Sequence, residues 1–460
     1  MAPTQKKAIV VGAGLVGSLW AVMLGQRGYA VDLYERRPDV RKSGFAGGRS
    51  INLAMSVRGW RALEKIGMAG VIGRQAIPMH GRMMHDTRGE LTFQPYGKKG
   101  QAIYSVSRGG LNLELLDLAD SHRDVHLHFD QRCQGVDLSA NALHLRHEHT
   151  GEQSRVSAPL LFGTDGAFSM VRDSLMKQTR RFNYSQQFLE YGYKELHIPP
   201  TAQGGHRMEP NALHIWPRGS FMLIALPNAD GSFTCTLFLA YEGEASFARL
   251  NTDAEIMAFF ERQFPDVIPL MPALLEDFRQ NPTADLVTIR CNPWHHDGKA
   301  LLLGDASHAI VPFYGQGMNA GFEDCSLLDA MVDDYAEDWS SIIPAFSRMR
   351  IPQANAMADL ALRNFIEMRD KVADPDFLLR KKIAARLHEQ YPEFLPLYSM
   401  VSFSHLPYDQ ALREGQAQDA FFERILQLEG IAENWADNPE VNRLFEQWWA
   451  QRREVLQEQV

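Results

Sequence analysis

The sequence predicts an α/β protein with a Rossmann-like βαβ domain, an inserted domain built on an antiparallel sheet, and a C-terminal helical region. Three observations lead to this class. A short apolar run at residues 8–11 is followed by a glycine-rich turn and a helical stretch. Residues 186–290 alternate apolar and polar positions between strong turn signals. From residue 319 onward the pattern is mostly helical.

The composition is that of an ordinary globular chain of two or three domains. The 460 residues are 45% hydrophobic and 22% charged, and the formal net charge is −9. This charge argues against sequence-independent binding to nucleic acid, which requires a concentrated basic surface. No stretch approaches the ~20 apolar residues of a membrane-spanning helix, and no secretory signal is recognised. We therefore expect a cytoplasmic protein that binds no nucleic acid and has no membrane span.

The cysteines are scattered and form no CxxC pair. In a chain of this length they are expected to be free thiols in a reducing compartment, each a small buried apolar side chain. No cluster of cysteine and histidine has the spacing of zinc ligands, so no metal site is expected. The cysteines are Cys133, Cys235, Cys291 and Cys325.

The first βαβ unit contains GAGLVG, a G-x-G-x-x-G motif between its strand and its helix. Gly12 permits a tight turn, Gly14 lets the backbone approach a pyrophosphate, and Gly17 lets helix and strand pack closely. Glu35 ends the next predicted strand, where a carboxylate can accept hydrogen bonds from ribose hydroxyls. The phosphates would lie at the positive end of the helix. The motif and its context predict a bound dinucleotide.

Periodicity and turn residues predict the other elements and the domain limits. Strands are predicted at 8–11, 31–34, 126–129, 142–146, 159–162, 212–216, 221–226, 233–240 and 300–303, with further hairpin strands within 78–105. Helices are predicted at 18–27, 50–75, 112–120, 253–263 and 442–460, the last one packing against its own chain. The Rossmann-like domain comprises 1–77, 106–185 and 291–370, the inserted domain 78–105 and 186–290, and the helical region 371–460.

The second half of the chain favours FAD over NAD as the dinucleotide. GDASH follows an apolar strand, and PFYGQGMN then leads into a helix. Asp305 could hold ribityl hydroxyls, although a helix cap is its alternative role. The amides of residues 317–319 could lie at a helix N-terminus and stabilise negative charge on a reduced flavin. Two such contacts suit an extended dinucleotide.

The motifs GAGLVG, GTDGAFSMVR and GDASHAIVPFYGQGMN, in this order, resemble those of the class A flavoprotein aromatic hydroxylases, which share the p-hydroxybenzoate hydroxylase fold. The resemblance implies FAD as bound cofactor and NADPH as a transient co-substrate, with no separate NADPH domain. It also implies that the Asp165 segment contacts both. The cofactor residues it implies are Gly12, Gly14, Leu15, Gly17, Glu35, Arg36, Arg108, Asp165, Asp305, Gly317, Met318 and Asn319.

Further segments are similar to the kynurenine 3-monooxygenases within that group. They include GRSINLAMSVRG, MHGRMMH, QPYG, YGYKEL, NALHIWPRG, LRNFIEM and YSMVSFSHLPY, dispersed along the chain. This resemblance implies that Arg82, Tyr96, Asn364 and Tyr398 bind the amino-acid carboxylate of L-kynurenine, with Glu367 nearby. It implies an aromatic-ring pocket walled by Leu213, Met222, Ile224, Phe238 and Phe313.

The residue types agree with these roles but also have ordinary explanations. Arginine offers a planar fork that matches a carboxylate, whereas most arginines are solvated surface charges. Tyr96 stands between proline and glycine, where a packed turn residue is common. Asn364 and Glu367 are one helical turn apart and share a face. The apolar residues are core by default.

The implied reaction is 3-hydroxylation of L-kynurenine with NADPH and O₂, through a flavin C4a-hydroperoxide. The aniline nitrogen of the substrate already donates electron density to the ring, so no catalytic side chain is assigned. Two alternatives stay open: a related flavin hydroxylase or reductase acting on another aromatic or lipid-like substrate, and a non-catalytic flavin-binding protein. A homodimer is also left open. The chain lacks the C-terminal anchor of the mitochondrial members and so resembles a soluble bacterial type.

Overall fold

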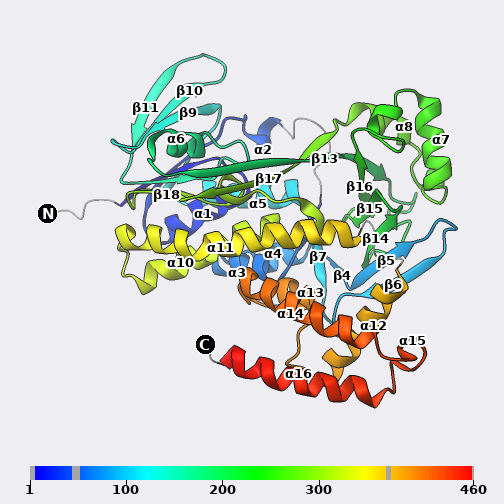
Figure 1. Cartoon of the computed structure of the whole chain (residues 1–460). Helices are drawn as coiled ribbons and strands as arrows, with labels where there is room; N and C mark the ends of the chain where they lie inside the picture. Colours follow the sequence, from blue (N-terminus) through cyan, green and yellow to red (C-terminus); the bar gives the residue numbers. More distant parts are fainter. Residues whose placement is uncertain (1–5, 44–51, 369–373, 458–460) are drawn as a thin grey trace.

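The computed structural model describes residues 6–43, 52–368 and 374–457, and it confirms the predicted α/β class (Figure 1). The Rossmann-like sheet has the strand order β18-β19-β12-β1-β2-β8, and its neighbours run parallel except at the β18 edge. Parallel strands are usually covered on both faces, which explains why β1 is apolar and buried after its first residue. The strands are β1 (Lys7–Val11), β2 (Ala30–Tyr34), β8 (Val125–His128), β12 (Leu160–Gly163), β18 (His295–His296) and β19 (Ala300–Leu302).

Helices α1 (Leu15–Gln26), α5 (Arg108–Ser121) and α10 (Gly317–Asp334) pack side by side in this domain. Trp20 of α1 is fully buried, with its ring 5.4 Å from that of Phe162. A meander of β9 (Gln131–Asp137), β10 (Ala142–His147) and β11 (Gln153–Ser157) lies beside α6 (Met170–Gln178). The remaining short helices are α2 (Val40–Ser43), α3 (Val57–Lys65), α4 (Ala69–Gly73) and α9 (Asp305–His308).

The prediction that residues 50–75 are helical throughout was wrong at its start. Asn52–Met55 forms β3, which pairs antiparallel with β7 (Ile103–Ser107), and β7 also pairs with β4 (Ile77–Met79). Since the partner strand lies about fifty residues further along the chain, no local periodicity marks these four residues as a strand. The rest of that range holds the predicted helical segments α3 and α4, and residues 50–51 lie outside the described residues.

The inserted sheet has the strand order β17-β13-β16-β15-β14-β5-β6. It is antiparallel, as predicted, except that β14 and β5 run parallel. Two strands from before residue 100 therefore join a sheet whose other strands come from 183–292. The strands are β5 (Gly81–His85), β6 (Leu91–Pro95), β13 (Asn183–Ile198), β14 (Ala212–Pro217), β15 (Met222–Pro227), β16 (Phe233–Ala240) and β17 (Ala284–Asn292).

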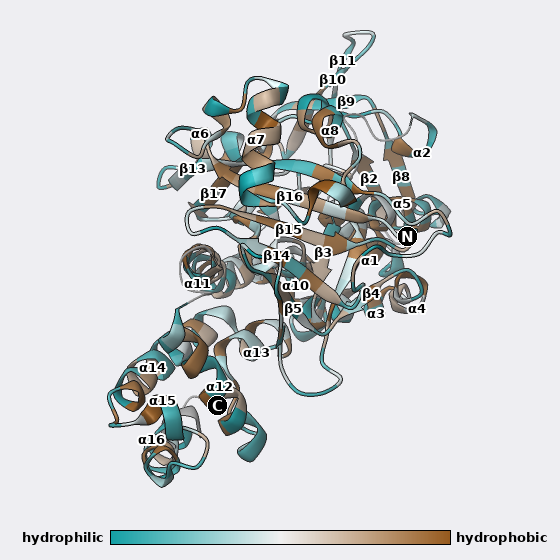
Figure 2. Cartoon of the chain, turned by 90° about the vertical axis from the view of Figure 1, so that its right-hand side faces the viewer, coloured by the Kyte–Doolittle hydropathy of each residue, from teal (hydrophilic) through white to brown (hydrophobic). Residues whose placement is uncertain are grey.

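Figure 2 shows helices on both sides of this sheet, and its two faces bury different sets of residues. On one face Trp216, Leu223 and Leu237 pack against α7 (Asp253–Gln263) and α8 (Leu274–Gln280). Helix α7 has the predicted bounds and begins with a capping box formed by Thr252 and Glu255. The other face lies toward α11 (Trp339–Ile366) and carries the residues discussed below as the candidate substrate site.

The C-terminal region is helical, as predicted, and lies below the sheets in Figure 1. Val441 and Phe445 of its last helix are buried in a cluster with Ile383 and Phe421, so this amphipathic helix packs against its own chain. No helix in the described ranges is long and apolar enough to cross a membrane. The helices are α11 (Trp339–Ile366), α12 (Pro375–Gln390), α13 (Leu397–Ser402), α14 (Tyr408–Leu426), α15 (Ile431–Asn434) and α16 (Pro439–Gln457).

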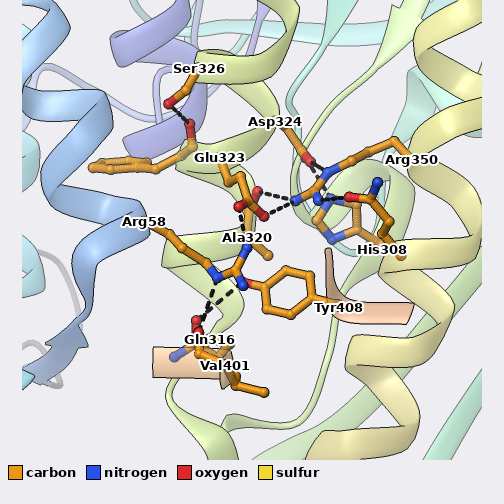
Figure 3. A network of polar contacts seen from close by, with 12 residues as sticks. Arg58, His308, Gln316, Ala320, Glu323, Asp324, Ser326, Arg350, Val401 and Tyr408 are labelled. Atoms are coloured by element: carbon orange, nitrogen blue, oxygen red, sulfur yellow. Dashed lines mark hydrogen bonds and ion pairs between the residues drawn. The ribbon is translucent and has the colours of Figure 1, made fainter. Parts of the chain in front are cut away.

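A buried network of charged side chains joins this region to the Rossmann-like domain (Figure 3). Glu323 of α10 pairs with Arg58 of α3 and, at 2.9 Å, with Arg350 of α11. Arg350 Nε also donates to Asp324 at 2.8 Å, and Asp324 contacts His308 Nε2 at 2.5 Å. We call these five side chains the charge network.

The charge network reaches the C-terminal helices through Arg58. Its Nε donates to the Val401 carbonyl at 3.0 Å, and another nitrogen donates to the Leu406 carbonyl at 2.5 Å. The Tyr408 ring lies 4.0 Å from the Arg58 guanidinium, and its hydroxyl donates to Gln316 at 3.2 Å. One arginine therefore holds the segment after α13 against the start of α10.

We expect Glu323→Gln to destabilise the fold strongly. The change leaves Arg58 and Arg350 buried with one carboxylate fewer, and breaking a buried ion pair costs about 3–5 kcal/mol. The free energy of unfolding would be measured by urea denaturation followed by circular dichroism. Asp334→Asn, at the exposed end of the same helix, is the matched control. A loss no larger than that of the control would contradict a stabilising role.

Candidate functional site

The glycine-rich turn has the geometry that close packing requires. Gly12 has φ +100°, and a Cβ there would lie 2.6 Å from the Thr164 carbonyl oxygen. A Cβ at Gly17 would collide with the carbonyl oxygen of Gly12. A Cβ at Gly14 would meet nothing within 4 Å, so the backbone here faces open space. Two glycines are thus required by packing, and Gly14 leaves room for a ligand to approach the chain.

The start of helix α1 presents a set of backbone N–H donors beside Gly14. No side chain caps this helix, and among the described residues no acceptor bonds the amides of Leu15, Val16 or Gly17. Free amides at the positive end of a helix form a site for an anion. Leu15, one of the predicted cofactor residues, contributes through this amide.

Glu35 follows β2 and lies against the same turn, as predicted. Its Oε2 accepts from the Ala13 amide at 2.9 Å, and its Oε1 accepts from Arg37 Nε at 2.8 Å. Burial works to raise the pKa of this carboxyl, but Arg37 and the backbone amides hold it below the ordinary value. The carboxylate is ionised and orders the loop. Arg36, the predicted neighbour, is exposed, and its role stays a prediction.

Asp305 lies at the carboxyl edge of the same sheet, directly after β19 and Gly304. It is exposed, and its side chain makes no hydrogen bond or ion pair with the described part of the chain. A free carboxylate at this edge suits the hydroxyls of a ribityl chain. Asp165 differs, because its carboxylate accepts from the Ser169 hydroxyl at 2.5 Å and the Met170 amide at 2.7 Å. It caps the start of α6, so its predicted contact with a cofactor gains no support from its hydrogen bonds.

The start of α10 is a second free helix N-terminus. The amides of Gly317, Met318 and Asn319 have no acceptor among the described residues, and no side chain caps this helix. The Asn319 side chain is fully used, since it bonds the Ser56 amide at 2.9 Å and the Ala54 carbonyl at 2.8 Å. Asn319 can therefore contact a flavin only through its backbone N–H group. Arg108, at the start of α5, is exposed.

These features fit FAD. Two uncapped helix starts, α1 and α10, lie in the domain that also holds the ordered Glu35 and the free Asp305. An adenosine, a diphosphate, a ribityl chain and a flavin ring each find a matching group in this set. The residues that would hold FAD are the amides of residues 14–17 and 317–319 with those two carboxylates.

A second candidate site centres on a buried guanidinium. Arg82 of β5 is 8% exposed and forms no ion pair with the described residues. Its Nε and the Tyr96 hydroxyl are both buried without a hydrogen-bond partner. Leaving such groups unpaired is costly in a folded protein, so they mark a place where a ligand supplies the missing partner.

Aromatic rings surround this guanidinium. It lies 5.6 Å from the Tyr96 ring and 5.4 Å from the Tyr398 ring. Tyr96 and Tyr398 stack at 4.8 Å, and Tyr314 stacks on the other side of Tyr398 at 5.6 Å. Burial alone would lower the pKa of Arg82, but Tyr96, Tyr398 and Glu367 keep it above the ordinary value. The site therefore holds a permanent positive charge beside phenol groups whose pKa burial raises.

The predicted ring-pocket residues lie on the same sheet face as Arg82. The register places Leu213 opposite Arg82 and Met222 opposite Phe238, and alternate residues of a strand share a face. Ile224 belongs to this set, because it is two residues from Met222 and contacts the same cluster. The Phe313 ring lies 4.9 Å from that of Phe238. The guanidinium of Arg82 and these apolar side chains therefore lie on one continuous sheet face.

Helix α11 closes this site from the opposite side. Asn364, Glu367 and Tyr398 line one pocket together with Tyr314, Arg363 and Lys381. Asn364 Nδ2 donates to the Phe313 carbonyl at 2.6 Å, and Met368 sulfur lies 3.3 Å from the same nitrogen. Glu367 pairs with Lys381 of α12 at 3.0 Å. The predicted substrate residues are therefore brought together by three different parts of the chain.

Sequence reasoning missed several residues of these sites. Arg37 orders Glu35, Tyr314 extends the aromatic stack, and Lys381 pairs with Glu367. None of these three residues belongs to a motif whose residue spacing follows from a physical requirement. Tyr314 lies within the quoted PFYGQGMN segment, so its position beside Phe313 was the one available signal.

Comparison with known proteins identifies the family. Residues 5–360 match the FAD binding domain family. The chain is 48% identical to kynurenine 3-monooxygenase of Flavobacterium johnsoniae, over 96% of this chain and 99% of that protein. It is 49% identical to the Myxococcus xanthus enzyme of the same name over 92% of each chain, and 44% identical to that of Sus scrofa over 89% of this chain and 86% of that one.

Solved structures show the same fold at low identity. The tetrameric form of 2-methyl-3-hydroxypyridine-5-carboxylic acid oxygenase matches with a TM-score of 0.65 at 20% identity, over 84% of this chain and 98% of that one. PqsL, a probable FAD-dependent monooxygenase from Pseudomonas aeruginosa, matches with a TM-score of 0.61 at 17% identity, over 80% and 97%. These likenesses agree with the observed arrangement of the Rossmann-like domain and the inserted sheet. The chain belongs to the kynurenine 3-monooxygenase family of FAD-dependent monooxygenases.

Proposed function

We propose that this protein hydroxylates L-kynurenine to 3-hydroxy-L-kynurenine, using FAD, NADPH and O₂. The observation that carries the proposal is the buried, unpaired Arg82 at one end of an apolar sheet face. A ligand that satisfies it must carry an anion at one end and an apolar ring at the other. Kynurenine, an amino acid with an aniline ring, has this shape, and the curated relatives carry the name of the enzyme that acts on it.

Arg82 is proposed to bind the α-carboxylate of the substrate. Its guanidinium offers paired donors, and the phenol hydroxyls of Tyr96 and Tyr398 remain protonated because burial raises their pKa. Each can donate a further hydrogen bond to the same carboxylate. The stacked rings hold these hydroxyls in place at a small cost in conformational freedom.

Asn364 is better placed for the α-ammonium than for the carboxylate. Its Nδ2 is engaged by the Phe313 carbonyl and the Met368 sulfur, so Oδ1 remains, and an amide oxygen can only accept. Glu367 is a second acceptor on the same helix face, and Lys381 and Arg82 hold the pKa of its carboxyl below the ordinary value despite its burial. Acceptors on α11 and donors on β5 together match an amino-acid head group.

The remaining side chains orient the ring and exclude water. Leu213, Met222, Ile224, Phe238 and Phe313 provide an apolar floor that contains no titratable group. Bound FAD supplies the redox chemistry that activates O₂, and the uncapped start of α10 stabilises negative charge nearby. No protein base is required, because the aniline nitrogen already activates the neighbouring ring carbon. Correct positioning and a dry site are what this chain contributes.

The direct test is NADPH consumption by the purified, FAD-loaded protein with and without L-kynurenine, with 3-hydroxykynurenine assayed by chromatography. We expect the substrate to stimulate consumption and one product to form for each NADPH consumed. Stimulation without that product would favour a related hydroxylase or reductase acting on another substrate. A flavin-loaded protein that L-kynurenine neither stimulates nor binds would contradict the proposal.

Replacing Arg82 by methionine should weaken substrate binding while leaving the fold intact. A hydrogen bond to a charged group contributes about 1.5–3 kcal/mol, so KM for L-kynurenine should rise by roughly 10- to 100-fold, with a much smaller change in kcat. Thermal unfolding should show little loss of stability, because the guanidinium forms no ion pair with the described residues and methionine keeps the apolar stem of the side chain. Arg88→Met, at an exposed turn, is the control. An unchanged KM would refute the assigned role.

Asp305→Ala should weaken FAD binding. The carboxylate makes no hydrogen bond or ion pair with the described residues, and losing its hydrogen bonds to the ribityl hydroxyls would raise the dissociation constant by about 10-fold or more. Titration of the apoprotein with FAD, followed by flavin fluorescence, measures this without any turnover. Asp334→Ala, at the far end of α10, serves as the control. Equal affinity in the two variants would leave Asp305 without a cofactor role.

A further inference from the structure

The ion pair between Glu367 and Lys381 occupies one end of the candidate substrate site. Lys381 Nζ lies 3.0 Å from Glu367 Oε1, and the Lys381 side chain is 48% exposed while that of Glu367 is 17% exposed. Both residues line the pocket that also contains Asn364 and Tyr398. The ammonium of a lysine from α12 therefore contacts the carboxylate assigned above to the substrate ammonium.

Lys381 is the cation that pairs directly with Glu367. Arg363, one turn before Glu367 on α11, is engaged at 2.6 Å by Asp419 of α14, and Arg380 of α12 pairs with the same carboxylate. Arg82 of β5 interacts with Glu367 through space but forms no ion pair with it. Among the described residues, Lys381 alone makes an ion pair with Glu367.

We propose that Lys381 is an internal competitor of the substrate, whose ammonium holds the place on Glu367 that the α-ammonium of the amino acid takes. The inference rests on the proposed function. Binding exchanges one primary ammonium for another, and the displaced Lys381 returns to water at little cost because its side chain is already half exposed. Lys381 thereby lowers the apparent affinity for the amino acid, and its release frees this contact between α11 and α12.

Glu367 does not depend on Lys381 alone to stay ionised. Burial raises the pKa of this carboxyl, but Arg82 and Arg363 act together with Lys381 to hold it below the ordinary value. The carboxylate therefore stays charged, and able to attract an ammonium, when Lys381 is replaced. A methionine at this position would remove the competitor while keeping the apolar stem of the side chain.

The test compares the binding of L-kynurenine with that of its analogue lacking the α-amino group. Calorimetric titration of the FAD-loaded parent, Lys381→Met and Lys381→Arg would be used, with Lys382→Met as the control on the next exposed position of the same helix. Exposed ion pairs are weak, so removing this one should tighten L-kynurenine binding by about two- to fivefold. Lys381→Arg and the control should resemble the parent, and Lys381→Met should not tighten the analogue.

The outcomes separate this inference from the proposed function. Weaker L-kynurenine binding in Lys381→Met would overturn the inference, because it would mean that the lysine contacts the substrate directly. Unchanged binding, or equal tightening of the analogue, would overturn it as well. In both cases the parent still binds L-kynurenine. Failure of the parent to bind it would instead refute the proposed function, on which the inference depends.

Discussion

The charge network around Glu323 is the interaction on which the relative placement of the two candidate sites depends. Arg58 contacts Glu323 of α10, the Val401 carbonyl in α13 and the Leu406 carbonyl after it, and the Tyr408 ring and hydroxyl join the same guanidinium to Gln316. Gln316 directly precedes the uncapped start of α10, and α13 carries Tyr398. The group that would face the flavin and a group that would hold the substrate are therefore fixed to one arginine.

Stability alone does not require such a network. Replacing a buried ion pair by well-packed apolar residues is often neutral or stabilising, because burial removes the charges from water. An apolar set would lack the directional hydrogen bonds to the Val401 and Leu406 carbonyls and the pair with Asp324, whose pKa His308 and Arg350 lower against the effect of burial. What the network adds is a single arrangement of three helices and one loop.

Arg82 presents the opposite case, since its charge is buried and forms no ion pair within the described part of the chain. In the charge network each guanidinium is matched by a carboxylate from a neighbouring helix, whereas the guanidinium of Arg82 lies against the rings of Tyr96 and Tyr398 and interacts with Glu367 without forming an ion pair with it. Cation–π contacts recover part of the lost hydration, about 0.5–2 kcal/mol each, but supply no hydrogen bond to Nε. An anion bound here would supply the hydrogen bond that Nε lacks, so the proposed site would favour a charged head group over a neutral one.

The sequence predicted those parts of the structure that depend on local chemistry. The strand, turn and helix around Gly12 and Gly17 follow from apolar runs and glycine spacing, and so do the bounds of α7. Parts that depend on distant partners escaped prediction, such as the strand β3, which exists because β7 pairs with it. The same limit applies to side chains. Asp165 is used as a helix cap and Arg58 is a buried structural cation, and no pattern in the chain separates these uses from cofactor binding or solvent exposure.

The amino-acid head group would be bound between the inserted sheet on one side and the helices on the other. Different kinds of interaction hold these two sides in place. On the sheet side, Arg82 lies beside an apolar floor in which the rings of Phe313 and Phe365 stack at 4.1 Å. On the helical side, α12 meets Glu367 through a partly exposed ion pair. Apolar packing of this kind is rigid, while partly exposed ion pairs are weak and exchange readily with ligands and water. A substrate that binds Arg82 of β5 through its carboxylate and Glu367 through its ammonium would act at the weaker of these contacts, the ion pair between Glu367 and Lys381. Occupancy of the site and the position of α12 would then be linked through Glu367.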